Sequence, residues 1–218
     1  FSFAAFNRDF LKTRNGMSML VLQSSDETAD REEFLKKNLH VYAPFDFQRL
    51  AKLPDGSEET VGFSLTFLGD ESLPDMGFFT CKQWRPDLFW KKEYQTHANG
   101  AEGVDEVFVV APDPSAPVKF LAAFADATDF ETDEGVARVR TPGGALGVYT
   151  PDAFKARFPD AFDEAAFASP FFAGYAIKCG DTGKARSCWK DAGLDVRDSG
   201  GHPWVHPKDG LGCVIYAA

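Results

Sequence analysis

The stretch of residues 81–99 holds the densest group of side chains that could bind or convert a small molecule. Gln83 could hydrogen-bond a ligand, and Trp84, Phe89 and Trp90 could form the walls of an apolar pocket. The same aromatic side chains could instead pack as core and seal one end of the fold. The stretch therefore predicts either a binding pocket or a packed end.

Four further polar residues are candidates for a site. His97 could carry a proton, or its ring could hold a loop in place by a hydrogen bond, and Asn99 follows it as a possible ligand contact. Glu106 lies on an expected strand and could be a general base with a raised pKa or a solvated strand end. Arg8 could bind a substrate carboxylate or pair with a neighbouring acid.

Phenylalanine is abundant, with 22 residues in a chain of 218. Phe63, Phe67 and Phe79 fall at alternating positions of expected strands, so they share one face of a sheet. This face could be ordinary core, or it could line a cup for a flat or aliphatic substrate. We therefore include Phe63 and Phe79 among the candidate substrate-binding residues.

Charge and hydropathy exclude several classes of partner. The 23 basic residues and 33 acidic residues give a formal net charge of −10, which argues against nucleic acids and anionic membranes. No apolar run approaches the roughly 18 residues that a membrane span needs. Four cysteines without a C-x-x-C spacing indicate free thiols, and we expect a bacterial, cytoplasmic protein.

An internal repeat organises the chain. Residues 19–41 align without a gap on residues 174–196, so that Asp26 meets Asp181, and residues 107–113 begin a fainter third copy. Each copy reads as a short apolar strand, a helix cap and an amphipathic helix. The sequence therefore predicts copies of one structural unit.

Capping residues support the two clearer helices. Ser24 and Glu27 have the spacing of a capping box in the first copy. In the last copy, Asp181 is a suitable N-cap and Gly193 a suitable stop just past the helix. Both helices should therefore begin directly after the first strand of their copy.

Strand-like runs separated by turn signals follow each helix, for example around the turn expected at residues 54–57. Each copy therefore reads as a β-α-β-β-β module. Between the modules, residues 85–101 and 151–170 read as connectors, and the second could hold a helix bearing aromatic residues. The three modules span about residues 17–84, 103–150 and 171–218.

This array resembles the vicinal-oxygen-chelate superfamily, which includes glyoxalases, extradiol dioxygenases and bleomycin-resistance proteins. The resemblance is to its glyoxalase-like branch, close over residues 1–111 and looser over 112–218. It is carried by Phe6–Leu11, Gly16–Leu22, Phe45–Phe47, Phe63–Leu65, Gly77–Cys81, Phe89–Trp90 and His97–Ala101.

The resemblance implies an α+β fold in which tandem modules form incomplete, cup-shaped mixed β-barrels. Residues 1–101 would be the second half of an N-terminal glyoxalase-like domain, and residues 102–218 a C-terminal glyoxalase-like domain. Members of the branch usually carry one more module upstream, so we expect the chain to be part of a longer one. Relatives commonly carry a His where this chain has Trp84.

Superfamily members that use a metal carry a His on the first strand and a Glu on the last strand of a module. These positions fall on Met19, Glu106 and Gly174, and on Cys81 and Tyr216. A catalytic metal needs about three protein ligands, and this set does not supply them. We expect no cofactor from this segment, and a divalent metal only if an upstream module adds ligands.

The resemblance implies a glyoxalase-like enzyme of unresolved lyase, isomerase or dioxygenase class that acts on a small apolar molecule. The alternative is a metal-free binding or sequestering protein of the bleomycin-resistance type. A third interpretation, a structural remnant, would have a cup filled with side chains. Because one of three modules lacks a mate, we expect either a homodimer or an open apolar sheet face.

Overall fold

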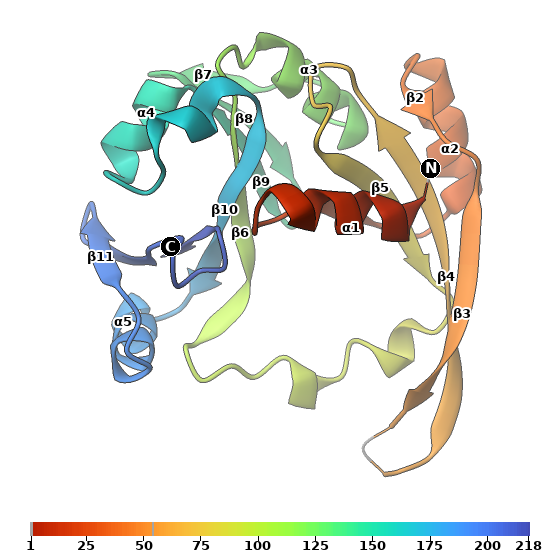
Figure 1. The fold of residues 1–218 in the computed structure, drawn as a ribbon. Helices are drawn as coiled ribbons and strands as arrows, with labels where there is room; N and C mark the ends of the chain where they lie inside the picture. The colour runs from red at the N-terminus through yellow and green to blue at the C-terminus, as the bar shows by residue number, and fades with distance from the viewer. Residues whose placement is uncertain (1, 54) are drawn as a thin grey trace. The chain divides into compact units, whose positions relative to one another are not determined.

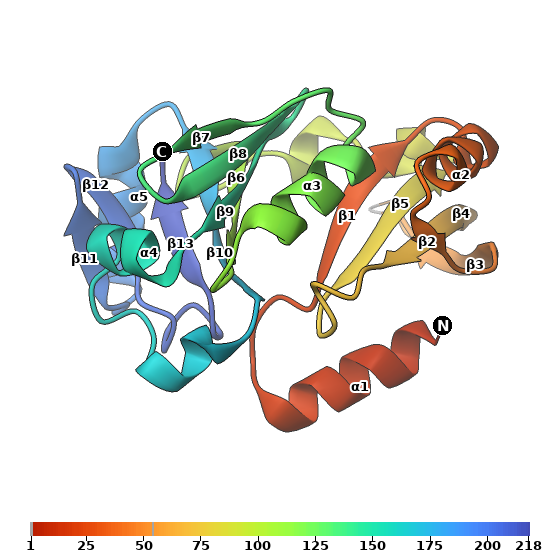
Figure 2. The ribbon, with the colours of Figure 1, turned by 90° about the horizontal axis from the view of Figure 1, so that it is seen from above.

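The structure, a computed structural model, describes residues 2–53 and 55–218. Phe1 and Pro54, which begin the expected N-terminal domain and the expected turn, lie outside these described residues. The described residues divide into two compact units (Figures 1 and 2): unit 1 holds residues 2–3, 19–53 and 55–95, and unit 2 holds residues 4–18 and 96–218. Helix α1 (Phe3–Thr13) begins at the end of the first segment of unit 1 and continues in unit 2.

Unit 1 is a mixed β-sheet with one long helix. Its strand order is β1-β5-β4-β2, with β3 also pairing with β4, and β1 runs parallel to β5. Helix α2 packs against β2, β4 and β5 and buries Phe34. The elements are β1 (Met19–Ser24), α2 (Glu27–Lys36), β2 (His40–Val41), β3 (Phe45–Lys52), β4 (Glu58–Gly69), β5 (Gly77–Gln83), η1 (Pro86–Leu88) and η2 (Lys92–Tyr94).

The cap of α2 differs from the expected capping box. The Asp26 carboxylate accepts hydrogen bonds from the backbone N–H groups of Thr28 and Ala29, both at 3.1 Å, so Asp26 is the N-cap. The Ser24 hydroxyl instead accepts from the Asp26 N–H at 3.1 Å. The expectation of a Ser24 N-cap was therefore wrong, because the strand continues through Ser24 and the carboxylate two residues later reaches more orphan donors.

Unit 2 joins two modules in one eight-stranded sheet, in the order β11-β12-β13-β10-β6-β9-β8-β7. Equivalent strands of the two modules follow one another in the same order from each edge to the centre of the sheet. At the centre, the first strands of the modules, β6 and β10, pair antiparallel. The elements are β6 (Ala101–Val110), α3 (Ser115–Phe124), β7 (Glu131–Asp133), β8 (Val136–Thr141), β9 (Gly144–Tyr149), α4 (Pro151–Arg157), η3 (Glu164–Ala168), β10 (Phe171–Cys179), α5 (Thr182–Asp191), β11 (Val196–Ser199), β12 (His202–Val205) and β13 (Val214–Ala217).

The repeated module is thus confirmed as the organising unit of an α+β fold with curled sheets. Asp181 caps α5 through its carboxylate, and Gly193 follows the helix with a φ of +76°, as predicted. In the second connector, the expected helix is α4, which ends at Arg157 and carries one aromatic residue, Phe154. Pro159 follows directly and disfavours helical backbone at the residue before it. Among the described residues, none of the helices combines the length and apolarity that a bilayer crossing requires.

Candidate functional site

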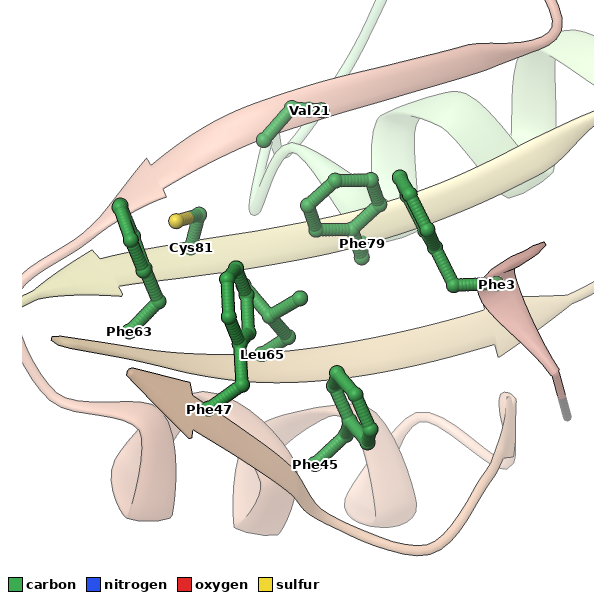
Figure 3. Close-up of a pocket in the computed structure, with 8 residues that line it drawn as sticks. All are labelled: Phe3, Val21, Phe45, Phe47, Phe63, Leu65, Phe79 and Cys81. Atoms are coloured by element: carbon green, nitrogen blue, oxygen red, sulfur yellow. The ribbon is translucent and has the colours of Figure 1, made fainter. Parts of the chain in front are cut away.

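Unit 1 contains an apolar hollow of about 450 Å³ on one face of its sheet (Figure 3). Side chains from all four long strands and from the start of α1 turn towards it. We call this site the apolar hollow. The described residues that line it are Phe3, Val21, Phe45, Phe47, Phe63, Leu65, Phe79 and Cys81.

Strand register places these side chains on one face. Side chains alternate between the two faces of a strand, so residues at i and i+2 share a face. On β4 and β5, Leu65 lies opposite Cys81, and Phe45 of β3 lies opposite Leu65 from the other side. One rung further, Phe79 pairs with Val21 of β1. The hollow therefore follows from alternating apolar residues in four adjacent strands.

Aromatic rings form the walls through direct contacts. Phe47 stacks on Phe63 with ring centroids 4.8 Å apart and planes 19° apart. Phe67 contacts Phe79 at 4.7 Å, and Phe3 lies 6.2 Å from each of these two rings. Such offset and tilted pairs are favoured over a face-to-face sandwich and stabilise the packing of the rings beyond their burial. The rings of the wall therefore pack against one another.

The apolar residues lie on the side of the sheet away from α2. Phe3, Val21, Phe45 and Phe47 are 39–45% exposed. The opposite face instead buries small polar side chains, and Thr66 there donates to the Glu27 carbonyl at the start of α2, at 3.4 Å. Soluble proteins rarely leave a contiguous apolar surface uncovered unless something binds to it. This distribution makes the hollow a candidate binding surface.

Cys81 is the one titratable side chain among the described residues that line the hollow. Burial raises the pKa of its thiol above the ordinary value, so the thiol stays protonated at neutral pH. A protonated thiol is a weak nucleophile and a poor metal ligand. Cys81 therefore contributes polarizable, largely apolar surface to the hollow.

Only some of the residues predicted in the stretch 81–99 lie close to the hollow. Gln83 lies opposite Phe63 at the end of β5, one rung beyond Cys81. Phe89 contacts the Phe63 ring at a centroid distance of 5.2 Å. Both therefore lie close to the rim, where their roles as ligand contacts stay predictions.

Trp84 lies on the other face of the sheet. Its indole Nε1 donates to the Ser64 hydroxyl at 2.9 Å, and its ring covers Gly62, where a Cβ atom would overlap it. Ser64 and Gly62 alternate with the residues that face the hollow. Trp90 is 55% exposed and, like Trp84, is not among the described lining residues.

Three predicted polar residues belong to unit 2 rather than to the hollow. His97 is exposed in the loop before β6, where its backbone carbonyl accepts from the Gly100 N–H at 3.0 Å. The Asn99 side chain accepts from the Ala101 N–H at 3.1 Å and shapes the same loop. Arg8 is exposed on α1, with its Nε 3.9 Å from the Asp9 carboxylate.

Glu106 lies at the centre of a buried ion cluster in unit 2, and it is only 6% exposed. Its carboxylate accepts from Arg138 Nε at 2.8 Å and from the Tyr149 hydroxyl at 3.0 Å, and it lies 3.5 Å from Arg157 Nη1. Arg138 and Arg157 both donate to the Tyr149 hydroxyl. The expectation of a solvated strand end was wrong, because the curled sheet turns this position inward.

The ion cluster combines two guanidinium groups with one carboxylate. Burial opposes the charged form of Arg138, but its hydrogen bond to Glu106 and its interactions with Tyr149 together outweigh burial and raise its pKa. Burial and then the charge of Glu106 raise the pKa of Tyr149 to about 12, so the phenol stays protonated and donates. Glu106 is thus fixed by hydrogen bonds from Arg138 and Tyr149 and by its ion pair with Arg157.

Connector side chains fill the interior of unit 2. The guanidinium carbon of Arg157 lies 4.7–5.8 Å from the ring centroids of Phe108, Tyr149, Phe158 and Tyr216. The second connector contributes aromatic side chains to the same core cluster, which also includes β-strand residues. The interior of unit 2 is therefore filled with side chains, as we expected for a structural remnant. The candidate site is instead the apolar hollow of unit 1. The connector members of the cluster are Phe154, Phe158, Ala161 and Phe167.

The metal positions of the superfamily do not fit a divalent cation in this chain. Of the five, only Glu106 and Cys81 carry a donor suited to a metal, and they lie in different units. Glu106 is already bound by two guanidinium groups, which would repel a cation. Within residues 2–53 and 55–218, no three His, Cys, Asp or Glu side chains gather closely enough to hold a metal ion. That the segment binds no metal stays a prediction.

Sequence reasoning named two of the eight lining residues, Phe63 and Phe79. It missed Phe45 and Phe47, although their i, i+2 spacing on an edge strand was a usable signal. It also missed Phe3, because nothing local to the first residues shows that they pack on a sheet whose strands begin at residue 19.

Comparison with known proteins identifies the family. The sequence profile of the family described as "Glyoxalase-like domain" matches residues 2–125, more than half of the chain. The chain belongs to the glyoxalase-like domain family. A search of curated protein sequences gives no match.

Solved structures show the same glyoxalase-like fold. A hypothetical protein from Staphylococcus aureus is 11% identical with a TM-score of 0.67, over 100% of this chain and 71% of that one. A triple mutant of 4-hydroxymandelate synthase from Streptomyces coelicolor is 13% identical with a TM-score of 0.56, over 96% of this chain and 72% of that one. A fusion of a xylose isomerase-like TIM barrel with 4-hydroxyphenylpyruvate dioxygenase is 13% identical with a TM-score of 0.58, over 97% of this chain and 40% of that one. At these identities the likeness concerns the fold alone.

Proposed function

We propose that this glyoxalase-like protein binds an uncharged, apolar small molecule in the apolar hollow of unit 1. The observation that supports this is the composition of the lining, which combines five phenylalanines with Val21, Leu65 and a protonated Cys81. A volume of about 450 Å³ lies within the range typical of small-molecule sites. The favoured ligand is flat or aliphatic, because it must displace water from rings without losing hydrogen bonds of its own.

The geometry favours the binding alternative over the enzymatic one. An enzyme needs a nucleophile, an acid-base group or a metal within reach of the substrate. Cys81 alone among the described lining residues titrates, and burial raises its pKa, which disfavours the thiolate. Elemental analysis of the purified protein distinguishes the two roles: stoichiometric iron, manganese, zinc or nickel would favour the enzyme and contradict a metal-free binder.

Fluorescence titration with the neutral apolar dye Nile red tests the proposal. We expect saturable binding to the wild-type chain. Phe47→Ser removes the ring that stacks on Phe63, and we expect Kd to rise about tenfold, which corresponds to about 1.4 kcal/mol.

A matched control is Phe130→Ser in unit 2. Phe130 is 37% exposed and Phe47 is 39% exposed, so both substitutions remove a half-exposed ring from the surface. Phe130→Ser should leave the dye affinity unchanged. Equal losses in the two variants would mean that the dye binds exposed apolar surface in general, and the proposed site would then be rejected.

A further inference from the structure

The strands that line the apolar hollow change character at one end. On three of them, the second residue after a lining residue carries side-chain N–H donors instead of an apolar group. Glutamine and arginine side chains donate hydrogen bonds to ligand oxygens. We call this side of the hollow the donor end. Its residues are Gln23 of β1, Gln83 of β5 and Arg49 of β3, which follow Val21, Cys81 and Phe47.

Strand register places the donor residues on the face of the hollow. Residues at i and i+2 share a face, and so do residues paired across strands. Strand β1 runs parallel to β5, and both β3 and β5 run antiparallel to β4, so all three donor strands run in one direction. Gln23 pairs with Cys81, and Gln83 pairs with Phe63. Figure 3 shows Cys81 and Phe63 at this end of the hollow and Phe3 at the other.

The donor groups have hydrogen-bonding capacity to spare. Within the described residues, no protein group pairs with the side-chain amide of Gln23 or of Gln83. Gln23 is exposed and Gln83 is half-buried. Arg49 Nη1 donates one long hydrogen bond, at 3.4 Å, to the Leu50 carbonyl. A ligand oxygen at this end can therefore accept a hydrogen bond without breaking a strong one inside the protein.

The charges around the donor end balance. Glu59 stands two residues before Val61, the partner of Arg49, and so shares the same face of β4. Arg85 lies 3.7 Å from the Glu59 carboxylate and 2.9 Å from that of Asp87. The two arginines are thus matched by two carboxylates. This balance favours a neutral hydrogen-bond acceptor over an anion.

The opposite end of the hollow offers apolar side chains only. A smaller cavity of about 170 Å³ adjoins the hollow there and shares Phe3 and Phe45 with it. Its other described lining residues are Ala43, Pro44 and Phe67, none of which has a hydrogen-bonding side chain. The hollow is therefore asymmetric, with donors at one end and room for more hydrocarbon at the other.

We propose that the apolar hollow selects neutral ligands with a carbonyl oxygen at one end, and that this oxygen accepts hydrogen bonds at the donor end. The inference rests on the proposed function, since it assumes that the hollow binds a small molecule. The hydrocarbon part of the ligand lies against the phenylalanines, and the oxygen lies near Gln83 and Gln23. A carbonyl that leaves water needs a new donor, because an unpaired polar group in an apolar site costs free energy.

Displacement of Nile red by two matched probes tests the proposal. 2-Acetylnaphthalene has a ketone oxygen, and 2-isopropenylnaphthalene has a methylene group in its place. Gln83→Leu removes the amide, and we expect it to raise the Kd of the ketone about fivefold, as for the loss of one hydrogen bond. The Kd of the hydrocarbon should change by less than about twofold. Gln23→Leu, at an exposed position, should show the same preference and serves if circular dichroism finds Gln83→Leu unfolded.

Gln48→Leu is the matched control. Gln48 is exposed and lies between Phe47 and Arg49 on β3, so its side chain is on the opposite face of the sheet. The substitution adds the same apolar surface to unit 1 but removes no donor from the hollow. Both probes should keep their wild-type Kd in this variant.

Three results would overturn the proposal. Equal changes in Kd for the two probes in the Gln83 and Gln23 variants, or no change for either probe, would reject the donor end while leaving the hollow as a binding site. Tighter binding of 2-naphthoate than of the ketone, lost in Arg49→Gln, would mean that this end selects an anion. Failure of both naphthalenes to displace the dye from wild type would reject the proposed function together with this inference.

Discussion

The Glu106 carboxylate accepts a hydrogen bond from Arg138 Nε at 2.8 Å inside unit 2. Arg157 approaches the same carboxylate at 3.5 Å, so one buried negative charge serves two guanidinium groups. Glu106 stands where the resemblance places a metal ligand, and in this chain the position belongs to an internal ion cluster. The cluster contributes to the stability of unit 2, because its side chains fill part of the interior of the curled sheet.

Removing the charge of Glu106 should therefore unfold unit 2 more easily. Glu106→Gln keeps the shape of the side chain but leaves two guanidinium groups facing each other without a counterion. Breaking a buried pair in this way typically costs about 3–5 kcal/mol of unfolding free energy. Urea denaturation followed by circular dichroism measures the loss.

Glu131→Gln is the control for Glu106→Gln. Glu131 pairs with Arg140 at 3.2 Å, but both side chains are 67–68% exposed. Exposed pairs contribute little, so this variant should unfold at nearly the wild-type urea concentration. A loss of similar size in the two variants would show that the Glu106 cluster does not stabilise unit 2 in the way described.

The raised pKa of Tyr149 predicts that the unfolding free energy depends on pH in the alkaline range. Its pKa is raised to about 12 in the folded chain, against about 10 for an unfolded tyrosine. The neutral phenol stabilises the fold fully below about pH 10, and this contribution is lost as the pH rises towards 12. Two pKa units correspond to about 2.7 kcal/mol.

Urea unfolding at about pH 9 and about pH 11.5 measures this effect, since the two values lie on either side of the unfolded-state pKa. The stability of wild type should fall more steeply between them than that of Tyr149→Phe. Tyr94→Phe, at a 47% exposed tyrosine, should follow wild type. Parallel curves for all three proteins would argue against the raised pKa of Tyr149.

Sequence reasoning succeeds where the structure depends on local patterns. The Asp181 cap and the stop at Gly193 each rest on residues within one helical turn of the feature they set, and the module repeat rests on the order of such local patterns along the chain. The Ser24 cap failed for a local reason as well, because β1 continues through Ser24 and Asp26 stands directly before the helix, where its carboxylate accepts from Thr28 and Ala29.

Features that depend on distant residues were harder to predict. Glu106 looked like an isolated acid on a strand because its partners Arg138 and Arg157 lie 32 and 51 positions away in the printed sequence. Phe3 lines a hollow built from strands that begin at residue 19. A hydrophobic pattern fixes which face of a strand is apolar, but it does not say whether other parts of the chain cover that face.

Packing of Trp84 over Gly62 predicts that β4 accepts no side chain at this position. A Cβ atom at Gly62 would overlap the Trp84 ring, whose Nε1 is held by Ser64 at 2.9 Å. Gly62→Ala should therefore displace the indole and cost about 1–3 kcal/mol. Urea unfolding and a red shift of tryptophan emission would report the two effects.

Gly103→Ala is the control for Gly62→Ala. Gly103 also lies on a strand, but a Cβ atom there meets no atom within 4 Å. This variant should be as stable as wild type or slightly more stable, because alanine restricts the unfolded chain. If Gly62→Ala behaved the same way, the Trp84 ring would not occupy the space described.

The central claim is that the apolar hollow of unit 1 binds a small apolar ligand. Protection of Cys81 from alkylation tests this claim most directly. Iodoacetamide at about pH 8.5, where cysteine thiolates begin to form, is followed by mass spectrometry with and without saturating Nile red. Bound dye should slow alkylation of Cys81, which lines the hollow, at least about tenfold, and leave Cys188 of unit 2 unchanged. Saturable dye binding that leaves Cys81 as reactive as in the free protein would contradict the account.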